Sequence, residues 1–199
     1  MRKSNRPRRD PTVLLIAFIV CAMVLGALML KKYGERHRQP VTPPHSQQQG
    51  KFLVALFFAS PDGAGLVREG REIDPCSDTE DCVENVVGEL INGPLGDLEP
   101  TLPAATSIQD VQVNGDLALI DLGEELIKGL PSGSNAEMMA VYSIVNSITA
   151  NFPRIKKVKL LLNGKGIETL KGHLDLREPL VPDFTLEKKQ KTVKPPAAG

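Results

Sequence analysis

Two cysteines in the middle of the chain, Cys76 and Cys82, are its strongest candidates for covalent chemistry. Their separation of six positions suits a disulfide that ties a loop to a following helix, and a stable disulfide requires an oxidising compartment. The alternative is that Cys82 is a buried helix residue and Cys76 is a free loop thiol. The spacing does not indicate a redox-active pair, because such pairs typically have two residues between the cysteines.

Side chains that could bind a metal ion are scattered along the chain. The three histidines are far apart, so no two of them share a helical turn with a carboxylate or a cysteine. An acidic run between residues 74 and 84 could hold calcium weakly, but acidic side chains are also common in loops and at helix starts. The histidines are His37, His45 and His173, and the acidic run comprises Asp74, Asp78, Glu80, Asp81 and Glu84. The sequence therefore predicts neither a metal site nor a cofactor.

Catalytic patterns are equally sparse. Glu124 and Glu125 follow a predicted strand and could act as acid and base, but the side chains of adjacent residues point apart. Residues 132–134 (SGS) lack the pattern of a nucleophile elbow. Residues 164–166 (GKG) are not followed by the helix that a phosphate-binding loop requires. These patterns predict a protein that is not an enzyme.

Charge is segregated along the chain although the formal net charge is zero. Residues 1–50 carry nine basic and two acidic side chains, whereas residues 51–187 carry eleven basic and twenty-two acidic ones, a net charge of −11. A domain this acidic repels nucleic acid at long range, which argues against nucleic acid as a partner.

One basic group interrupts this acidic region, and it is a candidate interaction patch. Its sign is opposite to that of the acid-rich stretch from Glu69 to Glu89, so the two surfaces together would favour head-to-tail self-association. The alternative is that these side chains protect a solvated strand edge from aggregation. The group consists of Arg154, Lys156, Lys157 and Lys159.

An uninterrupted apolar run from Thr12 to Leu30 predicts a membrane-spanning helix. At ~1.5 Å per residue it would reach roughly 28 Å, close to the ~30 Å hydrocarbon thickness of a bilayer. Lys31 and Lys32 follow directly, without a cleavage site of small residues, which favours an anchor over a cleaved signal peptide. The flanking charges and the expected disulfide favour a cytoplasmic N-terminus and an extracytoplasmic domain.

The segments that would position the candidate residues alternate between strand and helix patterns. Strands are predicted over residues 51–59, 66–73, 111–113, 117–122, 157–162 and 167–170. The run at 51–59 is apolar almost throughout, which is typical of a strand in the middle of a sheet. Asn114-Gly115 and Asn163-Gly164 predict two-residue hairpin turns.

Two amphipathic helices are predicted between these strands, each beginning with a capping box. The capping boxes are Ser77 with Glu80 and Ser134 with Glu137, and the helices end at Asn92-Gly93-Pro94 and before Pro153. The resulting order is β-β-α-β-β-α-β-β. It predicts an α+β domain in which two helices pack on a largely antiparallel sheet.

The succession of these segments resembles the GerMN domain family over residues 51–181. The resemblance is carried by the order and spacing of INGP at 91–94, NGDLALIDL at 114–122 and LNGKGIETLKGHLDLREPL at 162–180. The family includes sporulation and spore-germination proteins of spore-forming bacteria. The resemblance implies an envelope-tethered extracytoplasmic module, and it supplies no catalytic residues. This chain differs in having one copy of the domain behind a helical anchor.

The sequence thus predicts five regions in the chain. These are a cytoplasmic basic N-terminus (1–11), a transmembrane helix (12–30), a Pro/Gln-rich spacer (31–50), a GerMN-like domain (51–181) and a disordered basic tail (182–199). We expect a single-pass protein of the inner or plasma membrane that presents a non-catalytic domain to envelope proteins or to copies of itself. The alternatives are a ligand-binding or regulatory module that senses cell-wall fragments or small molecules and, third, a hydrolase with a dispersed site.

Overall fold

The computed structural model describes residues 50–188, which belong to a compact unit spanning residues 48–199. The predicted transmembrane helix at 12–30 lies outside the described residues, as do almost all of the spacer and the chain after Lys188. Within the described range, no helix combines the length and the apolarity that a membrane crossing needs.

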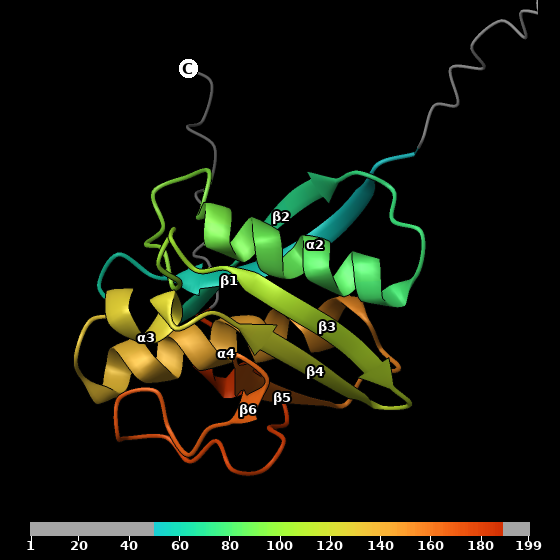
Figure 1. Ribbon diagram of the computed structural model, residues 1–199. Helices are drawn as coiled ribbons and strands as arrows, with labels where there is room; N and C mark the ends of the chain where they lie inside the picture. Colours follow the sequence, from blue (N-terminus) through green and yellow to red (C-terminus); the bar gives the residue numbers. More distant parts are fainter. Residues whose placement is uncertain (1–49, 189–199) are drawn as a thin grey trace, which may run out of the picture. The chain divides into compact units, whose positions relative to one another are not determined.

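The domain consists of six strands, three α-helices and one 3-10 turn in the described residues (Figure 1). In chain order they are β1 (Phe52–Ala59), β2 (Leu66–Ile73), α2 (Thr79–Asn92), β3 (Ile108–Asn114), β4 (Leu117–Leu122), α3 (Glu125–Gly129), α4 (Ser134–Asn151), β5 (Lys157–Leu162), β6 (Lys165–Gly166) and η1 (Phe184–Leu186). The α+β class is confirmed. The predicted order fits, with α3 and η1 added.

The strands form two sheets rather than the single sheet that was predicted. β1 and β2 form an antiparallel ribbon, and β3-β4-β5-β6 form a mixed sheet in which β4 and β5 run parallel. The parallel pair arises because α3 and α4 carry the chain back between β4 and β5, as a parallel connection requires.

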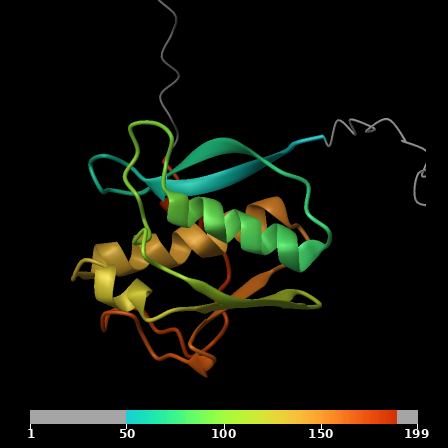
Figure 2. The same cartoon turned by 45° about the horizontal axis from the view of Figure 1, so that its top comes forward.

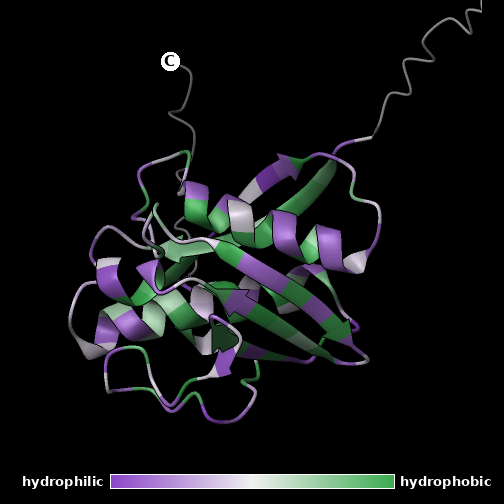
Figure 3. Ribbon diagram, in the orientation of Figure 1, coloured by the Kyte–Doolittle hydropathy of each residue, from purple (hydrophilic) through white to green (hydrophobic). Residues whose placement is uncertain are grey.

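The helices α2 and α4 lie between the ribbon and the mixed sheet, as Figures 1 and 2 show from two directions. α2 packs against β1 and β3, and α4 packs against β1 and β5. The main core therefore draws buried residues from both sheets and both helices, for example Phe58, Val87, Ile144 and Leu160. α2 keeps hydrophilic residues on its outer side, which makes it amphipathic as predicted (Figure 3).

β1 was predicted to lie in the middle of a sheet, and this is wrong because its neighbour on one side is a helix. The apolar run nevertheless has both faces covered towards its end. Leu56 and Phe58 enter the main core, whereas Phe57 enters a second, smaller core with Leu66 and Met139. The start of the strand is open, and Leu53 is 76% exposed.

Polar side chains of α4 take the place of a neighbouring strand along β1. Asn151 accepts a hydrogen bond from the Ala55 amide at 2.8 Å and donates one to the Ala55 carbonyl at 2.7 Å. Ser147, one turn earlier, accepts from the Phe57 amide at 3.0 Å. Among residues 50–188 no strand lies beside this edge of β1, and side chains of α4 bond the main chain of Ala55 and Phe57 instead.

The two helix starts differ from the predicted capping boxes. α2 is capped by Asp78, whose carboxylate accepts a hydrogen bond from the Asp81 amide at 2.9 Å, and not by Ser77. α4 follows Gly133, which has a φ of 127°, and no side chain caps it. Glu137 has a different role, described below.

The predicted hairpin turns are partly confirmed. Asn163 and Gly164 connect β5 to β6 with φ values of 49° and 76°, as a tight hairpin turn requires. The other turn consists of Gly115 and Asp116, because Asn114 pairs with Leu117 across the hairpin. β6 is shorter and earlier than the predicted strand at 167–170.

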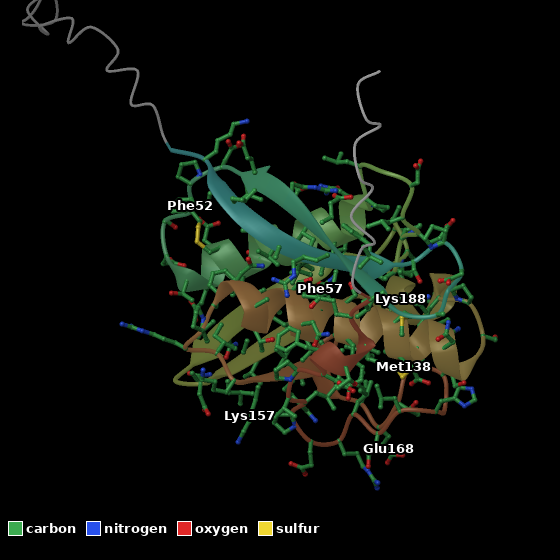
Figure 4. The ribbon with its side chains drawn as sticks, turned by 180° about the vertical axis from the view of Figure 1, so that it is seen from behind. Phe52, Phe57, Met138, Lys157, Glu168 and Lys188 are labelled. Carbon is green, nitrogen blue, oxygen red and sulfur yellow. A yellow bond between two sulfur atoms is a disulfide. The ribbon has the colours of Figure 1, made fainter. Side chains whose placement is uncertain are left out.

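Residues 180–188 form a segment that we call the strap, which runs from β5 across α4 to β2. It begins with a bridge between Leu180 and Val158, and Asp183 exchanges two hydrogen bonds with the buried side chain of Asn146. Its Phe184 ring lies 5.9 Å from the ring of Phe57. Phe57 is labelled in Figure 4. Residues 182–188 therefore belong to the folded domain and not to the tail that was predicted to be disordered.

Candidate interaction surface

Cys76 and Cys82 are joined as a disulfide, with their Cα atoms 5.1 Å apart. The bond ties the loop after β2 to the first turn of α2. It lies at the same end of the domain as Phe52, as Figure 4 shows by the yellow sulfur–sulfur bond. Its position makes it a brace for the start of the helix.

Reduction of this disulfide is expected to lower the free energy of unfolding by about 2 kcal/mol, because a ring of this size restricts the unfolded chain only moderately. Urea denaturation with and without dithiothreitol measures the difference. A Cys76→Ser variant is the control, since dithiothreitol should no longer change its midpoint. An unchanged midpoint for the wild-type chain on reduction would contradict the prediction.

The four members of the predicted basic patch do not act as one group. Lys159 donates hydrogen bonds to the carbonyls of Leu176, at 2.8 Å, and Arg177, so its ammonium group holds the C-terminal loop. Lys156 donates to the carbonyl of Pro153. Within residues 50–188, Arg154 and Lys157 have neither an ion pair nor a side-chain hydrogen bond. These two are the members of the patch that are available to a partner.

Arg154 also lines a hollow of about 420 Å³ at one end of the domain. The hollow lies where α2 begins, where the β3–β4 turn comes close and where α4 ends. Its lining residues are Thr79, Val113, Gly115 and the segment from Asn151 to Ile155. Because Thr79 is the first residue of α2, the acidic helix start and the basic patch adjoin here rather than lying on separate faces.

Part of the acid-rich stretch is used inside the domain, around the buried side chain of Arg71. This guanidinium group is 6% exposed and pairs with Glu69 and with Glu89, the latter at 2.8 Å. It also donates to the carbonyls of Glu89 at 3.2 Å and Gly93 at 2.9 Å, and it lies over the ring of Phe58. Arg71 thereby fastens β2 to the end of α2.

The electrostatics of Arg71 favour its charged form. Burial by itself lowers the pKa of Arg71, but the hydrogen bonds to Glu89 and Glu69 outweigh it and the pKa is raised above its ordinary value. The sequence pattern gave no signal for this cluster, because an arginine in the exposed pattern of β2 resembles a solvated side chain.

A second buried charge, Glu137, organises the loop formed by residues 169–173. The side chain of Glu137 is fully buried in the first turn of α4. Its carboxylate accepts hydrogen bonds from the amides of Leu170 at 2.8 Å, Lys171 at 3.0 Å and His173 at 2.9 Å, and from the hydroxyl of Thr169. This one carboxylate thus accepts hydrogen bonds from most of the residues of the loop.

Burial alone would raise the pKa of Glu137. The hydrogen bonds from Thr169 and from the loop amides outweigh that effect and hold the pKa below its ordinary value. The carboxylate is therefore kept ionised inside the protein. Both of its carboxylate oxygens accept hydrogen bonds from the loop.

The remaining candidate residues do not converge on a catalytic or metal centre. Glu124 pairs with Lys128 at 3.0 Å, whereas Glu125 accepts a hydrogen bond from the Ser107 hydroxyl at 3.2 Å. His173 borders a polar recess of about 320 Å³ within the C-terminal loop. In the described part of the chain, no three side chains of the metal-binding types lie close enough to hold an ion.

Comparison with known proteins gives a family and a fold. A family model, Germane, described as "Sporulation and spore germination", matches residues 55–168, which is more than half of the chain. The tandem GerMN domains of the sporulation protein GerM from Bacillus subtilis match with a TM-score of 0.55 and 19% identity. That match covers 66% of this chain and 46% of the tandem structure, so this chain spans about half its length.

The first GerMN domain of the same Bacillus subtilis protein matches with a TM-score of 0.50 and 21% identity, over 66% of this chain and 96% of that one. At these identities the likeness establishes the fold alone. None of the curated proteins compared with the chain matches it. The loop at 169–173 and the strap lie beyond the residues that the family model matches.

Proposed function

Because this chain belongs to the Germane family of sporulation and spore-germination proteins, we propose that it is a non-catalytic interaction module of the bacterial cell envelope. It is held at the inner or plasma membrane by residues 12–30 and displays its domain outside the cytoplasm. Its partners are envelope proteins or further copies of itself, in a process linked to sporulation or germination. The apolar run at 12–30 and the disulfide between Cys76 and Cys82 support this placement.

The proposal that the module is non-catalytic is supported by the structural role of its buried charges. Among the described residues, Arg71 and Glu137 are the buried ionisable side chains, and the contacts of both hold structural elements together. A general acid or base instead needs a face that is directed at a substrate. The charges left for recognition are exposed ones such as Arg154 and Lys157.

Crosslinking in native membranes followed by purification of the full chain tests the proposal. We expect a protein neighbour to be recovered with the wild-type chain and to be lost with the double variant Arg154→Glu/Lys157→Glu. The matched control is Lys128→Glu/Lys165→Glu, which makes the same change of charge on exposed lysines elsewhere. Recovery of no protein neighbour, together with saturable glycan binding, would overturn the proposal.

The hollow of about 420 Å³ beside Arg154 supports a second candidate function, the binding of a small molecule or cell-wall fragment. Its lining combines apolar side chains such as Val113, Phe152 and Ile155 with a few polar groups, which is the usual make-up of a ligand pocket. Binding of muropeptides, measured by nuclear magnetic resonance, distinguishes this function, since a ligand must shift the signals of the lining residues.

A further inference from the structure

The loop that follows α2 presents an exposed apolar side chain. We call residues 93–97 the tip loop, and Leu95 at its centre is 80% exposed, the highest value for a large apolar side chain within residues 50–188. Asp97 follows two residues later and is exposed as well. Its carboxylate has neither an ion pair nor a hydrogen bond with the described part of the chain. The tip loop therefore offers an apolar group and an unpaired negative charge close together.

The tip loop is held in place by the buried cluster around Arg71. The guanidinium group of Arg71 donates a hydrogen bond to the Gly93 carbonyl at 2.9 Å. The Glu69 carboxylate, which pairs with Arg71, accepts hydrogen bonds from the Leu95 amide at 3.1 Å and 3.3 Å. The main chain of Leu95 is thus fixed, while its side chain is left in solvent. A group that is already fixed loses less conformational entropy on binding, which favours its use in a contact.

The hollow beside Arg154 has the complementary properties. Val113, Phe152 and Ile155 contribute apolar lining. Arg154 adds a positive charge that has no partner within residues 50–188. The volume of about 420 Å³ is larger than a leucine side chain, so Leu95 would fit with space for its neighbours. The hollow therefore matches the tip loop in both polarity and charge.

The tip loop and the hollow lie at opposite ends of α2, so they cannot meet within one chain. α2 begins at Thr79, which lines the hollow, and its 14 residues end at Asn92, beside the tip loop. Figures 1 and 2 show the loop after α2 and the β3–β4 turn at opposite ends of this helix. We propose that the tip loop of one copy of this chain inserts Leu95 into the hollow of a second copy, where Asp97 pairs with Arg154 of the partner subunit.

A contact of this kind is heterologous, because it joins two different surfaces. Each pair of copies keeps one free tip loop and one free hollow, so further copies can join in a row or a ring. The interface is small, and small interfaces are weak in solution. Copies held at one membrane, as proposed above, meet at a raised effective concentration, which favours a weak contact. The inference rests on the self-association included in the proposed function and names its two surfaces.

Disulfide trapping in membranes tests the contact with two differently tagged full-length chains, both carrying Cys21→Ser. One chain carries Gly96→Cys in the tip loop, and the other carries Pro153→Cys in the lining of the hollow. A mixed covalent dimer is expected under mild oxidation, because the contact brings these positions within the reach of a disulfide. The control replaces Pro153→Cys by Gly166→Cys, and a β-carbon at Gly96 or Gly166 meets nothing within 4 Å. Equal yields of mixed dimer from the two pairs would overturn the proposal.

Substitution of Leu95 tests the apolar part of the contact. Leu95→Ser in the Gly96→Cys chain is expected to lower the yield of mixed dimer about tenfold, because burial of a leucine contributes at least that factor to binding. Val181→Ser in the same chain is the matched control, since Val181 is also apolar and 58% exposed but lies in the strap. This control should leave the yield unchanged.

Charge reversal tests the ion pair. Asp97→Arg in the Gly96→Cys chain should lower the yield at least about fivefold, because two like charges then meet. Arg154→Glu in the Pro153→Cys chain should restore it, and a yield that stays low refutes the pairing. If the hollow belongs to a small molecule or to another envelope protein, Leu95→Ser leaves the yield unchanged and this inference fails. The crosslinking described above would still recover a neighbour if the proposed function holds.

Discussion

Replacement of Arg71 by alanine is expected to lower the free energy of unfolding by about 3–5 kcal/mol, because it removes a buried guanidinium group that binds two partly buried carboxylates and two main-chain carbonyls. Glu69 and the carbonyl of Gly93 lose a donor in the interior, and β2 loses its connection to the end of α2. Urea denaturation of the purified domain at neutral pH measures the effect. Arg71→Lys should show an intermediate loss, because it keeps the charge but not the planar fork.

Arg177→Ala is the matched control for this prediction. Arg177 pairs with Asp175 at 2.7 Å, but both side chains are exposed, and such surface pairs typically contribute below about 1 kcal/mol. A loss for Arg71→Ala as small as that for Arg177→Ala would show that the buried cluster does not fasten the ribbon to the helix.

Glu137→Gln is expected to lower the free energy of unfolding by about 2–4 kcal/mol with little change in side-chain volume. The amide group of glutamine brings donors of its own to a place where the loop already supplies the donors from Leu170, Lys171 and His173. Hydrogen exchange should report the change locally, as faster exchange of the loop amides. Glu168→Gln, an exposed substitution directly before this loop, should leave both readings near those of the wild type.

The lowered pKa of Glu137 also predicts a dependence on pH. Between the ordinary carboxyl pKa of 4.5 and the lower value in the folded protein, the unfolded chain binds more protons than the folded one. The stability that Glu137 contributes is thus present above pH 4.5 and is lost as the pH falls through the folded-state pKa. The free energy of unfolding is measured from about pH 7 to about pH 3 for the wild type and for Glu137→Gln. The variant should lack the pH dependence that Glu137 contributes, and identical profiles for the two proteins would contradict the assignment.

The sequence predicted well those elements whose signals are local. β2 at 66–73 and β5 at 157–162 have the predicted bounds, and α2 ends at the Asn92-Gly93 signal. The position of β1 was predicted wrongly for a physical reason. An apolar run shows that both faces of a strand are covered, but it does not show whether strands, helices or a strap cover them.

The two buried charges were missed because most of their partners are distant in sequence. Ser134 and Glu137 have the spacing of a capping box, yet the carboxylate bonds to residues more than thirty positions later. The strap gave a weak signal in Phe184 and Leu186, two apolar residues just before the lysine-rich stretch at 188–194. No local pattern distinguishes them from a solvated tail, since their packing depends on Phe57 and its neighbours, which are distant in sequence.

The polar side chains of α4 have a consequence for the apolar run of β1. Ser147 and Asn151 bond main-chain groups of β1 that an intruding strand from another molecule would otherwise use. The helix therefore shields this run from edge-to-edge contact between molecules.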